Sequence, residues 1–212
     1  MSFEVQVSKG FGNATFYINE KVIRFDGKEV LLNNITGFSY MSTQTKTYGI
    51  NTNKTFEISL WENNNAYPTT IRFSAAFGGG ESNDKFGSII DQLWNYFGNE
   101  MLNKIHQELM AGKVYQLTPS IKLTSQGMIV LRKPWFSKPY EVIGNWRELQ
   151  MSASNGALSI KSKVNSKARI WEQLSSKNMW LLYMYTNWLF KNSDVIYSLM
   201  AVPNNYKLLE KK

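Results

Sequence analysis

The sequence predicts an α+β fold, mainly β, built from two similar units of roughly one hundred residues each. Seven Trp, eleven Tyr and twelve Phe favour strands with aromatic packing. Short runs of alternating apolar and polar residues are separated by Gly, Asn and Asp turn signals. The same order, short strands and then an apolar helix, occurs twice. We therefore expect one unit at residues 1–112, a second at 113–192 and a tail at 193–212.

The first half begins with a series of short strands. Alternation predicts strands at residues 3–7, 15–18, 22–25, 29–32, 35–40, 55–62 and near 71–73. Residues 42–54 are rich in Thr, Asn and Lys, so we expect a long loop there. The glycines at positions 78–80 have no following Lys-Ser or Lys-Thr pair, which indicates a hinge rather than a phosphate loop.

A long amphipathic helix is predicted over residues 83–111. Its apolar side chains recur at steps of three and four residues and define one stripe: Phe86, Ile90, Leu93, Trp94, Phe97, Met101, Ile105 and Leu109. Gly112 can adopt the left-handed conformation that ends a helix. A single stripe indicates that this helix covers the open side of a sheet.

The second half repeats this plan with low sequence identity. Strands are expected near residues 121–123 and 128–131, followed by a loop from Pro134 to Pro139. The Asn155-Gly156 pair predicts a hairpin before residues 157–163. A constant offset aligns residues 31–41 with 142–152, so that Ile35 matches Trp146, Phe38 matches Leu149 and Tyr40 matches Met151.

The two halves differ in charge. Residues 1–112 contain 9 Lys and Arg against 11 Asp and Glu, a net of −2, whereas residues 113–212 contain 15 against 5, a net of +10. The sum is the +8 of the whole chain. A basic second half suggests an acidic partner such as lipid head groups, nucleic acid or an acidic protein, although solubility alone also explains it.

The register of one hairpin can be argued from its apolar residues. Four of them must point toward the core: Leu158, Ile160, Ala168 and Ile170. A three-residue turn at 165–167, with Val164 paired to Ala168, satisfies this condition and sets Lys163 opposite Arg169. The outer face then contains Lys161, Lys163, Arg169 and Trp171. Facing like charges are destabilising unless an anion, or water with salt, neutralises them.

We therefore predict an anion-binding or partner-binding surface formed by Arg132, Lys133, Lys138, Lys161, Lys163, Lys167, Arg169 and Trp171. An aromatic side chain among basic ones suits base stacking or an anchor beside lipid head groups. A solvated outer sheet face is the alternative.

The second half resembles the pleckstrin-homology-like (PH-like) superfamily, including GRAM-type and bacterial PH-like domains. The resemblance rests on residues 122–132, Trp146-Arg-Glu-Leu149 and residues 155–160. It implies tandem barrels or sandwiches of six or seven antiparallel strands, each with a C-terminal helix, and a non-enzymatic module for phosphoinositides, peptides or proteins. Phosphoinositide-binding members carry basic residues on the first hairpin, where this chain has only Lys122 and, past its end, Arg132 and Lys133.

A second apolar segment, residues 179–190, is apolar on all sides if it is helical, so it requires burial on two sides. Packing within the chain is one solution. The other is a homo-oligomeric or partner interface at Trp180, Leu181, Met184, Tyr185 and Trp188. Residues 195–202 are strand-like and predict an additional edge strand.

The sequence proposes no reaction. His106 is the only histidine and cysteine is absent, which excludes a His-based dyad, a thiolate nucleophile and a His/Cys-rich metal site. We expect no enzyme activity, no cofactor and no metal. The first five residues do not resemble a signal peptide, so a cytoplasmic location is expected. The expected function is recognition of a protein or an acidic ligand or membrane; the alternatives are nucleic-acid binding and structural self-assembly.

Overall fold

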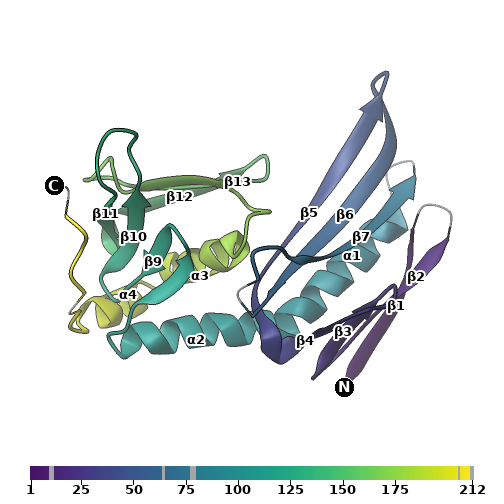
Figure 1. Cartoon of the computed structure of the whole chain (residues 1–212), viewed down its shortest axis with the longest axis horizontal. Coiled ribbons are helices and arrows are strands. Elements are labelled where there is room, and N and C mark those ends of the chain that lie inside the picture. Colours follow the sequence, from purple (N-terminus) through teal and green to yellow (C-terminus); the bar gives the residue numbers. More distant parts are fainter. Residues whose placement is uncertain (10–11, 64, 77–79, 205, 211–212) are drawn as a thin grey trace. The chain divides into compact units, whose positions relative to one another are not determined.

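A computed structural model describes the chain except for residues 10–11, 64, 77–79, 205 and 211–212 (Figure 1). The chain divides into two compact units, Met1–Glu100 and Met101–Lys212. The division lies inside the long helical segment, whereas the predicted boundary is at residue 112. The prediction of a mainly β, α+β fold is confirmed, because strands in antiparallel sheets account for more of the described residues than helices do. No helix in the described residues is long and apolar enough to cross a membrane.

The first unit contains two antiparallel sheets joined by a short 3-10 turn. The elements are β1 (Ser2–Ser8), β2 (Asn13–Asn19), β3 (Val22–Phe25), β4 (Lys28–Leu31), η1 (Leu32–Asn34), β5 (Ile35–Thr47), β6 (Ile50–Glu62) and β7 (Thr69–Ala76). Each strand pairs with its sequence neighbour, giving sheets β1–β4 and β5–β7. Alternate side chains such as Phe16, Ile18, Phe56 and Ile58 are buried, which the period of two predicts.

The prediction of a long loop at residues 42–54 is wrong. Strands β5 and β6 continue through this region as a hairpin, with Thr43 opposite Thr55 and Thr47 opposite Ile50. Tyr48 and Gly49 both have positive φ, 52° and 81°, as a type I′ two-residue turn requires. The strand signal is hidden because most side chains here are polar and exposed, so no apolar face alternates with a polar one.

The long predicted helix is confirmed with one interruption. It consists of α1 (Gly80–Leu93), the single π-helical turn η2 (Trp94–Gly98) and α2 (Asn99–Met110). Gly98 is buried, and a Cβ atom at this position would lie 2.4 Å from Cε3 of Trp94. The close approach of the Trp94 ring therefore requires glycine. Of the glycines at 78–80, the first two lie outside the described residues, and Gly80 begins α1.

The second unit follows the same element order. Its elements are β8 (Tyr115–Thr118), β9 (Ile121–Leu123), β10 (Gly127–Arg132), β11 (Tyr140–Asn145), η3 (Trp146–Glu148), β12 (Leu149–Ser154), β13 (Ala157–Ser162), β14 (Arg169–Gln173), α3 (Met179–Lys191) and α4 (Ser193–Met200). The sheets are β8–β11 and β12–β14. In both units a four-stranded meander leads through a 3-10 turn to a three-stranded meander and then a helix.

The predicted alignment of the two halves is shifted by three residues. The 3-10 turns begin at Leu32 and Trp146, an offset of 146 − 32 = 114 instead of 111. Both of these side chains are buried. Ile35, which begins β5, thus corresponds to Leu149, which begins β12. The predicted matches of Ile35 with Trp146, Phe38 with Leu149 and Tyr40 with Met151 are wrong, because frequent apolar residues fit more than one offset at low identity.

The extra strand predicted at residues 195–202 is also wrong. Residues 193–200 form α4, in which Ile196 and Leu199 are buried three positions apart, a helical spacing. After α4 the chain runs back along the first sheet of this unit. Nε2 of Gln126 donates to the carbonyl of Val202 at 3.1 Å, and the amide of Glu141 donates to the carbonyl of Leu209 at 2.9 Å.

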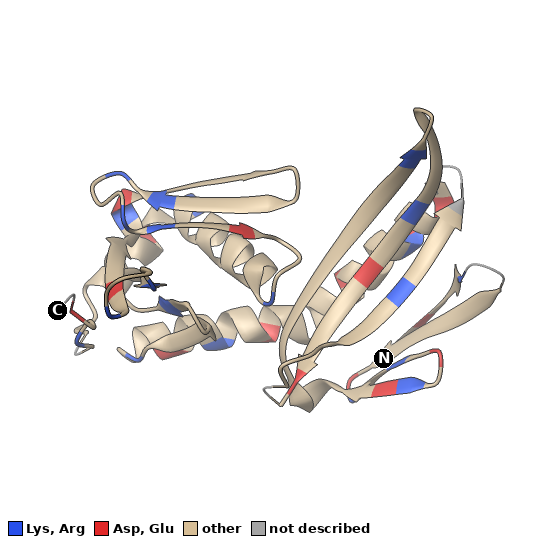
Figure 2. Cartoon of the chain, turned by 45° about the horizontal axis from the view of Figure 1, so that its top comes forward, with Lys and Arg blue, Asp and Glu red and all other residues tan. Residues whose placement is uncertain are grey.

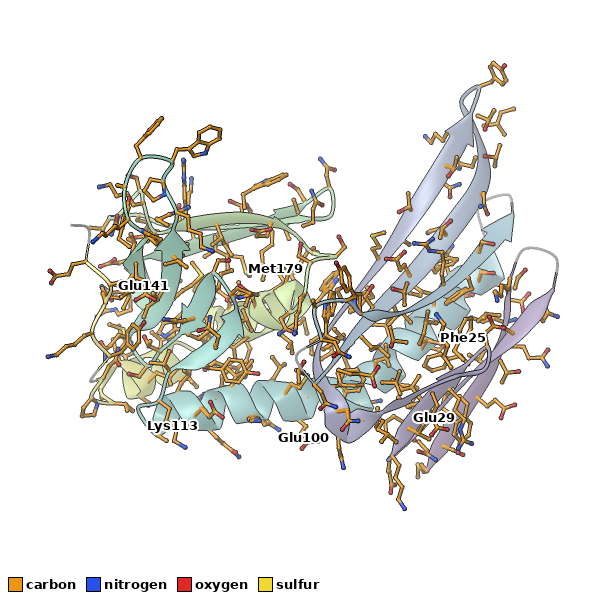
Figure 3. All side chains as sticks on the ribbon, in the orientation of Figure 1. Phe25, Glu29, Glu100, Lys113, Glu141 and Met179 are labelled. Carbon is orange, nitrogen blue, oxygen red and sulfur yellow. The ribbon has the colours of Figure 1, made fainter. Side chains whose placement is uncertain are left out.

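The returning tail closes over a buried carboxylate on β11, that of Glu141 (labelled in Figure 3). Its side chain is 1% exposed and accepts hydrogen bonds from Lys122 Nζ at 2.6 Å, from Tyr206 Oη at 2.8 Å and from the Leu209 amide at 3.1 Å. Burial by itself would raise the pKa of Glu141, but the hydrogen bonds from these donors have the larger combined effect, and the pKa is lowered. Burial lowers the pKa of Lys122, but the bonds to Glu141 and Tyr206 outweigh it and leave that pKa raised.

Candidate anion-binding site

Three of the predicted basic residues meet where the end of β10 approaches the turn between β13 and β14. Arg132 ends β10, Lys167 lies in the turn and Arg169 begins β14. Together with Tyr140 and Ser166 they line a cavity of about 310 Å³. No lining residue is acidic, so the cavity is a concentration of positive charge. Figure 2 maps the Lys and Arg positions onto these strands and turns.

Arg132 holds this arrangement together. Its Nε donates to the carbonyl of Lys167 at 2.9 Å and its Nη2 at 2.6 Å, and Nη2 also donates to the carbonyl of Arg169. Burial and the nearby charge of Arg169 both lower the pKa of the Arg132 guanidinium. An anion bound in the cavity would relieve the repulsion between Arg132 and Arg169.

The turn itself is longer than predicted. Lys161, not Lys163, lies opposite Arg169, and the amide of Ser162 donates to the carbonyl of Ala168 at 2.8 Å. The predicted three-residue turn is therefore wrong. A shift of two residues preserves which face is buried, so Leu158, Ile160, Ala168 and Ile170 still point inward.

Local hydrogen bonds explain the longer turn. The hydroxyl of Ser162 accepts from the amides of Val164 at 3.2 Å and Asn165 at 3.0 Å. The side-chain oxygen of Asn165 accepts from the amide of Lys167 at 3.1 Å. Such Ser and Asn turns compete with strand pairing, and here they end the ladder at Ser162.

The loop that follows Arg132 brings two more predicted residues, Lys133 and Lys138, which are both exposed. Between them the side chains of Trp135 and Phe136 are 95% and 99% exposed. The prediction did not include these two aromatic residues. The signal was present in the sequence, since two adjacent large aromatics lie between Pro134 and Pro139 in a short loop that also contains Lys133 and Lys138.

Three predicted residues, Lys161, Arg169 and Trp171, lie on the outer face of the β12–β14 sheet. Lys161 faces Arg169 across the sheet, and Trp171 is 67% exposed opposite Ser159. Lys161 also lines a separate hollow of about 500 Å³ together with Gln150, Ser152, Ser159 and Phe190 among others. The predicted outer position of Lys161, Arg169 and Trp171 is thus confirmed, whereas Lys163 lies past the end of β13, exposed in the turn. In the described part of the chain, no acidic side chain forms an ion pair with any of the three cations.

The predicted interface on α3 is only partly at the surface. Leu181 and Tyr185 are 0% and 1% exposed, so a surface role for these two is wrong. Tyr185 packs edge-on against the ring of Trp146, with ring centroids 6.1 Å apart, and this packing explains its burial. Met184 and Trp188 remain about one third exposed and Trp180 is half-buried, so their interface role stays a prediction.

The only histidine, His106, packs against two aromatic side chains of α3. Nδ1 of His106 lies 3.2 Å from the hydroxyl of Tyr185, and its ring meets that of Trp188 edge-on. Burial lowers the pKa of His106 and raises the pKa of Tyr185. In the described ranges, no group of three His, Asp or Glu side chains is placed to hold a metal ion.

Comparison with protein-family models, with curated proteins and with solved structures finds no match to this chain.

Proposed function

We propose that the chain is a non-catalytic recognition protein made of two PH-like units, and that its second unit binds an acidic ligand or surface. Support for the PH-like assignment comes from the order of elements: four strands, three strands and a helix, in each unit. The cytoplasmic location and the absence of catalysis remain parts of this proposal.

One observation carries the binding role: the cavity lined by Arg132, Lys167 and Arg169. Its two guanidinium groups come from different strands and its ammonium group from the β13–β14 turn, and no acidic side chain is among the lining residues. Guanidinium groups bind phosphate and carboxylate oxygens through paired hydrogen bonds. A cluster of this kind therefore suits a phosphate or carboxylate group better than a neutral partner.

Nucleic-acid binding is a second candidate, favoured by Trp171. This exposed indole shares the outer sheet face with Lys161 and Arg169, and exposed aromatics between cations serve as stacking surfaces for bases. A site on that face would share Arg169 with the Arg132 cavity, whose lining does not include Trp171.

Charge reversal tests the main proposal with inorganic polyphosphate as the probe. The variant K163E/K167E/R169E should bind at least about tenfold more weakly than the parent, because each lost cation removes one phosphate contact. The matched control is K21E/K46E/K104E, three exposed lysines outside the cluster. Both variants change the formal charge from +8 by six, to +2. Equal polyphosphate affinity of the parent and the first variant, measured by titration calorimetry, would contradict the proposal.

A further inference from the structure

We propose that the acidic partner is an anionic membrane surface, and that Trp135 and Phe136 enter its head-group region while the surrounding cations contact the lipids. This inference rests on the proposed function, and it specifies the partner of the same site. The loop concerned, residues 133–139, connects β10 to β11 and is called the aromatic loop below.

The aromatic loop exposes its two largest side chains almost completely. At 95% and 99%, Trp135 and Phe136 have greater exposure than any other Trp or Phe among the large exposed hydrophobics of the described chain. Trp171, the next, is 67% exposed. Exposed apolar side chains surrounded by polar residues mark interaction sites. Pro134 and Pro139 each fix a φ angle, so the loop loses less conformational freedom when it binds.

Cations surround the aromatic pair on both sides. Arg132 and Lys133 precede it and Lys138 follows it in sequence. The hydrogen bonds from Arg132 to the carbonyls of Lys167 and Arg169 tie the β13–β14 turn to the base of the same loop. Val164, in that turn, adds an apolar side chain that is 77% exposed. The site therefore combines exposed apolar side chains with Lys and Arg residues that lie next to them.

This combination matches the chemistry of a bilayer surface. Trp and Phe side chains partition into the boundary between head groups and acyl chains, and Lys and Arg are attracted to anionic lipids. A base-stacking site would instead support its aromatic rings against a groove that follows the nucleic-acid backbone. Rings that are 95% and 99% exposed have no such protein wall.

The deciding experiment compares two probes on the same protein variants. The lipid probe is a vesicle of equal parts phosphatidylserine and phosphatidylcholine, with pure phosphatidylcholine as the neutral vesicle. The soluble probe is inorganic polyphosphate. The variant W135S/F136S removes the apolar tips without changing charge. The control Y48S/Y67S removes two aromatics of the first unit that are 100% and 87% exposed.

The parent should sediment with the mixed vesicles and not with the neutral ones. W135S/F136S should bind mixed vesicles at least about tenfold more weakly, because membrane affinity scales with the apolar area that is buried. Its polyphosphate affinity and the vesicle affinity of the control should equal those of the parent. Equal vesicle binding by W135S/F136S and parent would overturn the inference while leaving the proposed function intact.

Binding of single-stranded RNA by the parent without binding of mixed vesicles would also overturn the inference. If K163E/K167E/R169E retains full polyphosphate affinity, the proposed function fails instead.

Depth-dependent quenching gives a separate readout. The emission difference between the parent and W135F isolates Trp135, and brominated acyl chains should quench this difference. An unquenched difference in vesicle-bound protein would place Trp135 outside the membrane.

Discussion

Charged side chains of the second unit differ in whether the protein neutralises them. Glu141 is buried and receives donors from β9 and from the C-terminal tail, so its charge is matched within the chain. Arg132 donates hydrogen bonds to backbone carbonyls and to no carboxylate among the cavity residues, so its charge adds to those of Lys167 and Arg169. A matched charge stabilises a fold, whereas unmatched charges of one sign are available to a ligand.

The pair of Lys122 and Glu141 gives a stability prediction. K122M should cost about 3–5 kcal/mol in the free energy of unfolding, since it leaves a buried carboxylate without its cation. E141Q should cost less, about 1–3 kcal/mol, because it leaves imperfectly paired donors. Urea denaturation at pH 7 measures both values. A smaller loss for K122M than for E141Q would contradict this account.

The same pair contributes to how stability varies with pH. Because the folded pKa of Glu141 is lowered, its contribution is complete above the unfolded value of about 4.3 and is lost as pH falls through the folded pKa. The pKa of Lys122 is raised, so its contribution is complete below about 10.4 and is lost as pH rises through the folded pKa. E141Q should therefore show a weaker decline of stability below pH 4 than the parent.

At the scale of elements, the π turn between α1 and α2 brings the ring of Trp94 against Gly98. A Cβ atom on Gly98 would lie 2.4 Å from this ring, which is held in place by a hydrogen bond from its Nε1 to Tyr40 Oη at 3.3 Å and by edge-on packing against Phe38. A ring fixed on several sides cannot move aside cheaply.

G98A should destabilise the protein by about 1–3 kcal/mol through this overlap, although alanine is the better helix former. The control is G87A in α1, where a Cβ atom would have no neighbour within 4 Å. G87A should stabilise the protein by up to about 1 kcal/mol. Thermal or urea unfolding of the two variants gives opposite signs if this is correct; stabilisation by G98A would refute it.

Elements with an apolar period were predictable from the sequence, and polar elements were not. The helix at 83–111 is predicted by its apolar stripe, and the core strands are predicted by the alternation of apolar and polar residues. The hairpin through residues 42–54 is exposed, so burial leaves no pattern on its sequence. The turn after Ser162 depends on hydroxyl and amide hydrogen bonds, which compete with strand pairing in a way that composition does not reveal.

The candidate site was predictable as a set of cations, but not as a geometry. The sequence separates Arg132 from Lys167 by 35 positions, and only the bonds from its guanidinium to the β13–β14 turn show that they share one cavity. The aromatic loop was visible as a motif, yet its importance depends on exposure, which a sequence does not report directly.

At the scale of the whole molecule, the repeated plan carries an unequal charge. Residues 1–100 contain 8 Lys and Arg against 10 Asp and Glu, and residues 101–212 contain 16 against 6, which gives −2 and +10. Two units with the same element order thus present different surfaces. In the function proposed above, the second unit is therefore the one that would select an acidic partner.

Helix α3 is already largely buried within a single chain, so a second copy is not required to cover its apolar residues. Six of its residues are buried: Met179, Leu181, Leu182, Tyr185, Thr186 and Leu189. We therefore expect light scattering to give the mass of one chain, 24.5 kDa. A mass of two or more chains would favour self-assembly through Met184 and Trp188. In that case M184E should reduce the mass, because a charge at an apolar interface is costly to bury.

The exposed turn of the β5–β6 hairpin offers a route for spectroscopic labelling. The chain has no cysteine, and Tyr48 at this turn is completely exposed. Y48C therefore creates a single thiol that a maleimide dye or a nitroxide can reach, and the native structure already accepts a non-glycine side chain at this positive φ. A reporter in the first unit would follow how that unit responds while the second unit, chemically untouched, is titrated with polyphosphate or with anionic vesicles.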